Sequence, residues 1–138
     1  MVISLHADPD LEYPFNSCYP DQTGAGDGLG TTLNLVMPVH TTWPEYKRQL
    51  EVAISRIADF GAGALVVSLG LDTLSGDPVA FPTATFDLFA EDFGEMGAII
   101  LKDTRLEHLP KVFLQEGGYK LEEVTKGVLN FFTMKTKV

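Results

Sequence analysis

The chain has 138 residues, the length of one domain, and its 45% hydrophobic and 21% charged residues are ordinary for a globular protein. The formal net charge of -9 argues against a nucleic-acid partner, because the phosphate backbone needs a basic surface. No apolar run reaches transmembrane length, the first residues lack the pattern of a signal peptide, and a single cysteine excludes an intrachain disulfide. We therefore expect a cytoplasmic protein that has no membrane partner.

Strands and helices are predicted to alternate along the chain. Short apolar runs predict strands at 2–5, 32–36, 64–69 and 111–115. Apolar residues at three- and four-residue spacing predict helices from the Thr41–Pro44 start signal to Gly61, from about Thr85 to Ile100, and from Leu121 to Phe132. Residues 10–31 have no periodicity and predict a long, functional loop. This order favours an α/β fold in which helices flank a mostly parallel sheet.

The run at 64–69 is typical of a strand buried on both faces, and Asp72 follows its carboxyl end. Ligands bind at this edge of parallel sheets. His6 with Asp8, and Glu116 with Tyr119, follow two further strands and should reach the same edge. Each residue alone has a simpler explanation as a turn former, a helix cap or a packed side chain, so only their convergence indicates a site.

Two further stretches bear on function and on the extent of the chain. The glycine-rich segment 24–30 does not fit a dinucleotide-binding motif, because a strand follows it and Asp27 would repel phosphate. Met1 leads directly into a core-type strand, and domains seldom begin in the middle of a sheet. We therefore expect the chain to be the later part of a longer protein.

Five blocks, in this order and spacing, resemble successive motifs of the histone deacetylase superfamily, and above all of its acetylpolyamine amidohydrolases. The blocks are Ser4-Leu5-His6-Ala7-Asp8-Pro9, Tyr13-Pro14-Phe15, the glycine-rich segment 24–30 with Asn34, Val67-Ser68-Leu69-Gly70-Leu71-Asp72-Thr73 with Asp77-Pro78, and Glu116-Gly117-Gly118-Tyr119. The resemblance implies an arginase/deacetylase-like fold, here incomplete, in which residues 1–138 form the C-terminal part of the catalytic domain. It also implies a zinc-dependent hydrolase that acts on acetylated polyamines or acetyl-lysine side chains.

The resemblance also implies roles for individual residues. Asp72 matches a zinc ligand, and Tyr119 matches the tyrosine that donates a hydrogen bond to the oxyanion of the tetrahedral intermediate. Other matched positions would contact the substrate or a structural monovalent cation such as potassium. The substrate-binding positions are Tyr13, Phe15, Gly117 and Gly118, and the cation-binding positions are Ser4 and Leu5.

The family's other zinc ligands and its tandem histidines have no counterpart among the three histidines, His6, His40 and His108. One aspartate cannot hold a catalytic zinc, and without a base no water is activated, so the chain alone should be inactive. We expect a complementing N-terminal part or a homodimer as partner. The alternative hypothesis is a non-catalytic truncated remnant or interaction domain of the same fold. A plain small-molecule binder is a third reading.

Overall fold

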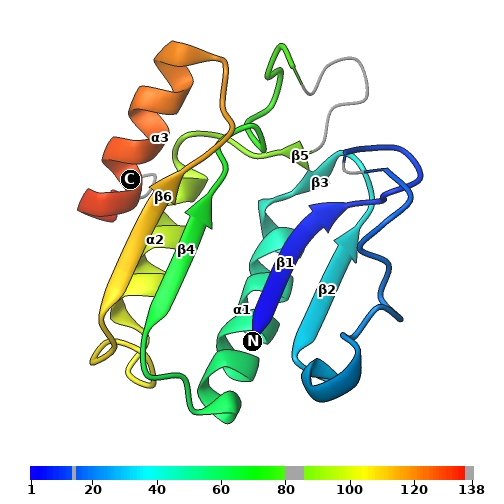
Figure 1. Ribbon diagram of the computed structural model, residues 1–138. Helices are drawn as coiled ribbons and strands as arrows, with labels where there is room; N and C mark the ends of the chain where they lie inside the picture. Colours follow the sequence, from blue (N-terminus) through cyan, green and yellow to red (C-terminus); the bar gives the residue numbers. More distant parts are fainter. Residues whose placement is uncertain (14, 80–85, 136–138) are drawn as a thin grey trace.

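Figure 1 shows the computed structural model of the chain, which describes residues 1–13, 15–79 and 86–135. Parallel strands alternate with helices, as the hydrophobic pattern predicts. In chain order the elements are β1 (Val2–Ala7), a 3₁₀ turn (Gly26–Gly28), β2 (Thr32–Met37), β3 (Thr41–Thr42), α1 (Trp43–Phe60), β4 (Leu65–Leu69), β5 (Phe86–Asp87), α2 (Asp92–Lys102), β6 (Lys111–Gln115) and α3 (Leu121–Thr133). The very short strands β3 and β5 were not predicted.

The strands form separate parallel pairs. β1 pairs with β2, β3 with β5, and β4 with β6. Within the described ranges no strand joins these pairs, so the expectation that β1, β4 and β6 share one sheet is wrong for this chain. β1, β2, β4 and β6 nevertheless run in the same direction, and their carboxyl ends lie at the same end of the molecule (Figure 1). The loops that follow them therefore project to one side.

Helix α1 begins and ends where its sequence signals predict. A proline in its first turn needs no backbone N–H there, and Gly61 ends the helix with a left-handed conformation (φ 71°). Its buried residues, Leu50, Ala53 and Ile54, recur at three- and four-residue spacing and face the core. Figure 1 shows α1 behind β1 and α2 behind the β4–β6 pair.

Helix α2 begins later than predicted. The proposed start at Thr85 lies outside the described residues, and the helix itself begins at Asp92. The Asp92 carboxylate accepts a hydrogen bond from the N–H of Phe89 (2.8 Å), which stabilises a turn before the helix. The Phe89 side chain is consequently 54% exposed instead of lying on the buried face of the helix.

Helices α2 and α3 pack closely on one face of the β4–β6 pair. A Cβ at Gly97 of α2 would lie only 2.8 Å from the carbonyl carbon of Phe131 in α3. Phe113 of β6 makes edge-to-face contacts with Phe131 and Phe132, at centroid distances of 5.4 and 5.3 Å. A residue without a side chain at position 97 therefore allows the two helices to approach each other.

The opposite face of the β4–β6 pair is exposed, which corrects the prediction that the strand at 64–69 is buried on both faces. Its apolar side chains, Val66, Val112 and Leu114, are 64%, 54% and 47% exposed. Parallel sheets are ordinarily covered on both faces, whereas the described helices cover only the face that carries Phe113. The composition of β4 correctly predicts a strand of a parallel sheet, but none of the described residues covers its second face.

Candidate functional site

The loops that carry Asp72 and Tyr119 leave neighbouring strands at the same edge. β4 and β6 are parallel, and their last residues, Leu69 and Gln115, lie opposite each other. Backbone hydrogen bonds continue beyond both strands: Glu116 N–H donates to the Leu69 carbonyl (3.2 Å), and Leu71 N–H donates to the Gly117 carbonyl (2.9 Å). The loop after β4 is thus fastened to the loop after β6.

The Asp72 carboxylate packs against the backbone of this second loop. A Cβ at Gly117 would come 2.5 Å from Asp72 Cγ, closer than real Cβ atoms approach other atoms. A Cβ at Gly70 would lie 3.1 Å from Asp72 Oδ1. Glycine at position 117 is therefore required for the place that Asp72 occupies, a role beyond the predicted contact with substrate.

The electrostatic environment of Asp72 is acidic. Burial, and then the negative charges of Asp77, Glu12 and Glu116, raise the pKa of the Asp72 carboxyl, although a backbone hydrogen bond partly opposes this. Burial, and then the charge of Asp72, also raises the pKa of Tyr46 in α1 to about 12. Glu12 belongs to the loop after β1, so side chains from the β1, β4 and β6 loops influence one another here.

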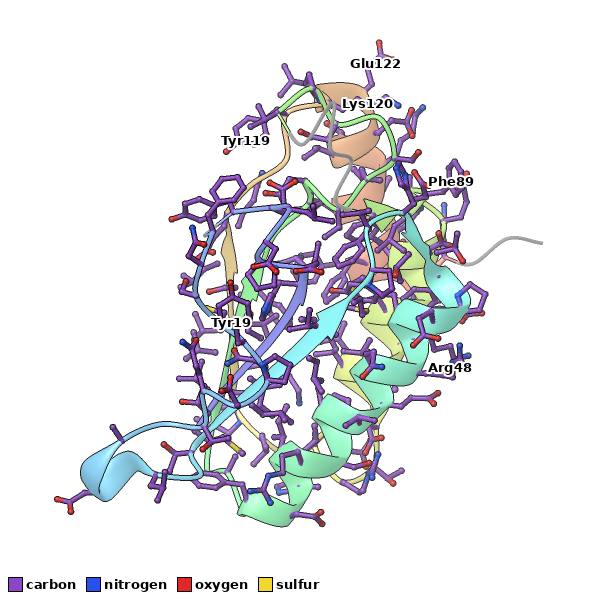
Figure 2. The ribbon with its side chains drawn as sticks, turned by 90° about the vertical axis from the view of Figure 1, so that its right-hand side faces the viewer. Tyr19, Arg48, Phe89, Tyr119, Lys120 and Glu122 are labelled. Atoms are coloured by element: carbon purple, nitrogen blue, oxygen red, sulfur yellow. The ribbon has the colours of Figure 1, made fainter. Side chains whose placement is uncertain are left out.

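Tyr119 is held by its backbone, while its side chain is half exposed. Its N–H donates to Asp77 Oδ2 at 2.7 Å. The preceding Gly118 has φ 120°, a conformation that favours glycine, and a Cβ there would lie 2.8 Å from the Leu71 Cβ. The Tyr119 ring is 51% exposed and points outward at the upper end of the molecule in Figure 2. A phenol in this position can donate a hydrogen bond to a molecule outside the chain.

These residues do not by themselves form a zinc site. Among the residues that the structure describes, no three His, Cys, Asp or Glu side chains lie together in a way that could hold a metal ion. A catalytic zinc takes three protein ligands, so Asp72 alone does not fit that requirement. The shallow hollows that flank α1 include residues such as Glu51 and Ser55, and contain neither Asp72 nor Tyr119.

Comparison with known proteins identifies the family. The family model for the histone deacetylase domain matches residues 1–134. The chain belongs to the histone deacetylase domain family. Acetylpolyamine amidohydrolase 2 of Pseudomonas aeruginosa is 36% identical over 130 residues, and the match covers 94% of this chain. Acetylpolyamine amidohydrolase of Mycoplana ramosa is 39% identical over 127 residues, and the match covers 92% of this chain.

The solved structures agree. The crystal structure of acetylpolyamine aminohydrolase from Burkholderia pseudomallei superimposes with a TM-score of 0.85 at 33% sequence identity and covers 96% of this chain. This confirms the predicted deacetylase fold. This histone deacetylase family chain spans only about a third of its relatives' length: 36% of the Pseudomonas protein, 35% of the Mycoplana protein and 36% of the Burkholderia chain. The incomplete sheet agrees with this partial coverage.

The residues proposed to contact substrate lie in exposed loops. Tyr13 and Phe15, in the loop after β1, are 77% and 52% exposed. The following segment is anchored to β2, because the buried Asn34 amide donates to the carbonyl oxygens of Tyr19 (3.0 Å) and Gln22 (3.1 Å). The loop thus has a fixed base, and both rings lie exposed on it. Their role as a substrate wall stays a prediction.

His6 has a structural role, as its simpler explanation proposed. Its Nε2 lies 2.9 Å from the Cys18 carbonyl oxygen, which can only accept, so Nε2 carries the proton. Its Nδ1 then accepts a hydrogen bond from the Ser4 hydroxyl at 2.8 Å. The Ser4 hydroxyl bonds to His6 and Leu5 is half-buried, and the proposed contact of both residues with potassium stays a prediction.

Asp77 is the residue of this site that sequence reasoning missed. The resemblance includes the Asp77-Pro78 pair but gives Asp77 no role, yet this residue is only 1% exposed and its carboxylate accepts a hydrogen bond from the backbone of Tyr119. Turn-forming aspartates are ordinarily exposed, and the local turn signal does not indicate that this one is buried. The burial of Asp77 could be predicted only by knowing which loop packs against its turn.

Proposed function

We propose that residues 1–138 form the C-terminal part of the catalytic domain of a zinc-dependent deacetylase that hydrolyses acetyl amides of polyamines or lysine side chains. The observation that carries this proposal is the packing of the Asp72 loop against the Gly117–Tyr119 loop, at the carboxyl ends of two parallel strands. Membership of the histone deacetylase family supports it. So do the acetylpolyamine amidohydrolases at 36% and 39% identity.

In this proposal the residues of the chain have distinct roles. Tyr119 donates a hydrogen bond from its phenol to the oxyanion of the tetrahedral intermediate, a contact that is stronger in the transition state than in the bound substrate. Asp72 would provide one carboxylate ligand for zinc in the completed domain. The other zinc ligands and the general base come from outside the described residues, so we expect the chain alone to be inactive. Tyr13 and Phe15 contact the aliphatic part of the substrate.

The decisive experiment compares the chain alone with the chain completed. We propose to assay it with acetylcadaverine and with an acetyl-lysine peptide in the presence of zinc, and we expect no turnover. The same chain should then be produced together with the part of the Mycoplana ramosa enzyme that precedes the matched segment, and we expect turnover that a chelator abolishes. Robust turnover by the chain alone would contradict the assignment of the missing groups.

Tyrosine variants of the completed enzyme test the role of the phenol. Tyr119→Phe should lower kcat by roughly 100-fold or more, the range found when one oxyanion donor is removed. Tyr19→Phe is the matched control, because it removes a phenol that bonds to Asp10 within the chain. Unchanged kcat in Tyr119→Phe would reject the proposed role of Tyr119. Equal losses in both variants would reject it as well.

A non-catalytic role is the second candidate, as a truncated remnant or interaction domain of the same fold. The exposed apolar side chains of Val66, Val112 and Leu114 favour it, because such a face is suited to contact another protein. The coding DNA upstream of Met1 separates the two candidates. An in-frame Asp-x-His motif with paired histidines would support the enzyme, whereas a stop codon before a genuine start site would support the remnant.

A further inference from the structure

Asp77 is a buried carboxylate that bonds to two backbone segments. Its side chain is 1% exposed. Oδ2 accepts the N–H of Tyr119 at 2.7 Å, and Oδ1 accepts the N–H of Val79 at 3.0 Å. Both oxygens of a carboxyl group can accept hydrogen bonds, and burial protects such bonds from competition by water. Asp77 therefore connects its own turn firmly to the loop that carries Tyr119.

The turn that carries Asp77 is itself fixed in the fold. Asp77 N–H donates to the Leu74 carbonyl (3.1 Å), and Ser75 N–H donates to the Leu88 carbonyl (2.8 Å). The Ser75 carbonyl oxygen also accepts a hydrogen bond from the Lys120 ammonium (3.1 Å), and the Ser75 hydroxyl donates one to the Asp87 carboxylate (3.0 Å). The turn thus offers a rigid support for the residues on either side of the Tyr119–Lys120 peptide bond.

The Tyr119 loop needs such a support. Tyr119 follows Gly117 and Gly118, and two successive glycines allow more backbone conformations than any other pair. A Cβ at Gly117 would collide with the Asp72 carboxylate and one at Gly118 with the Leu71 Cβ, so these contacts favour glycine at both positions. The first fixed point after them is the N–H of Tyr119, and Asp77 provides it.

We propose that Asp77 is a positioning residue: its carboxylate fixes the backbone of Tyr119 and thereby the place from which the phenol reaches substrate. The catalytic meaning of this contact rests on the proposed function, whereas the contact itself does not. In this proposal Asp77 touches neither substrate nor the reacting atoms. It acts only through Tyr119.

The four tyrosines allow a direct test on the chain as it is. In a sample labelled with ¹⁵N-tyrosine, Tyr119→Phe identifies the Tyr119 amide by its disappearance. Asp77→Ala should raise the hydrogen-exchange rate of that amide by roughly tenfold or more and shift its resonance. Asp77→Asn keeps one side-chain oxygen as acceptor and should rescue part of the protection. The ¹⁹F resonance of 3-fluorotyrosine at position 119 should shift more in Asp77→Ala than in Asp77→Asn, because the position of the ring depends on its backbone.

Controls separate positioning from general loss of structure. Asp27→Asn removes a charge at an exposed position and should leave the Tyr119 signals unchanged. In all variants the amides of Tyr13, Tyr19 and Tyr46 should keep their exchange rates. Should the Asp77 variants fail to fold, the through-hydrogen-bond coupling between Tyr119 ¹⁵N and Asp77 ¹³Cγ in the unaltered chain decides the matter.

Two results would overturn the proposal. One is that Asp77→Ala changes neither the amide resonance and exchange rate of Tyr119 nor its ¹⁹F resonance. The other is that no coupling is detected across the hydrogen bond between Tyr119 and Asp77. Its failure is distinguishable from failure of the proposed function. Unchanged kcat in Tyr119→Phe would reject the catalytic role, yet the exchange and fluorine measurements would still report whether Asp77 holds Tyr119.

Discussion

Gly117 and Asp72 form one structural unit, although they belong to different loops. The Asp72 carboxylate occupies the space that a side chain at position 117 would need, with Asp72 Cγ 2.5 Å and Oδ1 3.1 Å from the place of a Cβ. Leu71 N–H donates to the Gly117 carbonyl at 2.9 Å, so backbone and side chain contacts act together. The position of Asp72 therefore depends on the absence of a side chain at position 117.

Substitution of Gly117 should destabilise the chain. Gly117→Ala inserts a methyl group where the Asp72 carboxylate lies, and forced overpacking of this kind costs about 1–3 kcal/mol. Urea unfolding followed by circular dichroism measures the change. Gly63→Ala is the control, because a Cβ there meets no atom within 4 Å. Equal stability of the two variants would contradict the close packing of Gly117 on Asp72.

Asp72 should make the stability of the chain depend on pH. The folded chain raises the pKa of this carboxyl above 3.8, so between that value and the raised pKa the folded state binds more protons than the unfolded state. The free energy of unfolding therefore falls as pH rises through this window, and the loss is complete above the raised pKa. Asp72→Asn removes the charge and should stabilise the chain at pH 7.

The measurement is the difference in unfolding free energy between Asp72→Asn and the unaltered chain, taken from pH 3 to pH 7. We expect the stabilisation by Asp72→Asn to diminish toward acid pH, where Asp72 of the unaltered chain is protonated in both the folded and the unfolded state. Asp27→Asn removes an exposed charge and should show no comparable trend. Destabilisation by Asp72→Asn at pH 7 would show that the charged carboxylate is favoured by the fold, contrary to its burial.

Much of the fold could be predicted from the sequence, because local signals and tertiary structure agree. Pro44 and Gly61 delimit α1, and the apolar runs at β4 and β6 mark neighbouring parallel strands. The start of α2 was wrong because the turn between Phe89 and Asp92 depends on a side-chain hydrogen bond that periodicity does not report. Local patterns record what a segment prefers, not which turn its side chains stabilise.

The site was predicted only in outline. Asp72 and Tyr119 could be placed at one edge because parallel strands bring their carboxyl ends together. The contact of Gly117 with Asp72 and the burial of Asp77 could not be predicted, since both depend on how two loops pack. The exposed side chain of Val66 could not be predicted either, because composition indicates a strand suited to burial and cannot tell whether a covering layer is present.

Glu95 should couple helix α1 to α2 in a pH-dependent way. Its carboxylate accepts from the Trp43 indole (2.8 Å) and the Lys47 ammonium (3.2 Å), and these hydrogen bonds, that of Trp43 first, lower the pKa of Glu95 below 4.5. The stabilisation is present above the unfolded value of 4.5 and is lost as pH falls through the lowered value. Because the side chains of Lys47 and Glu95 are 40% and 43% exposed and solvent screens their attraction, Glu95→Gln should cost less than about 1 kcal/mol.

Trp43 is the single tryptophan, so its fluorescence reports this contact. Acid should change its emission as Glu95 becomes protonated, and Glu95→Gln should remove most of that change at low pH. Glu107→Gln, at an exposed position between α2 and β6, is the control and should retain it. An acid-induced change that persists in Glu95→Gln would assign the effect to another carboxyl group.

The bare face of the β4–β6 pair should make the isolated chain associate. Val66, Val112 and Leu114 place their apolar side chains on this face, where the described residues provide no cover, and burial of such surface contributes about 25 cal/mol per Å². The double variant Val66→Lys/Leu114→Lys should reduce association, because charges on a bare face oppose its burial against another chain. Sedimentation velocity at increasing concentration measures the effect, and Val52→Lys, at a 48% exposed position of α1, is the control. If the unaltered chain stays monomeric at the highest concentration, or if Val52→Lys reduces association equally, this face is not what drives the chains together.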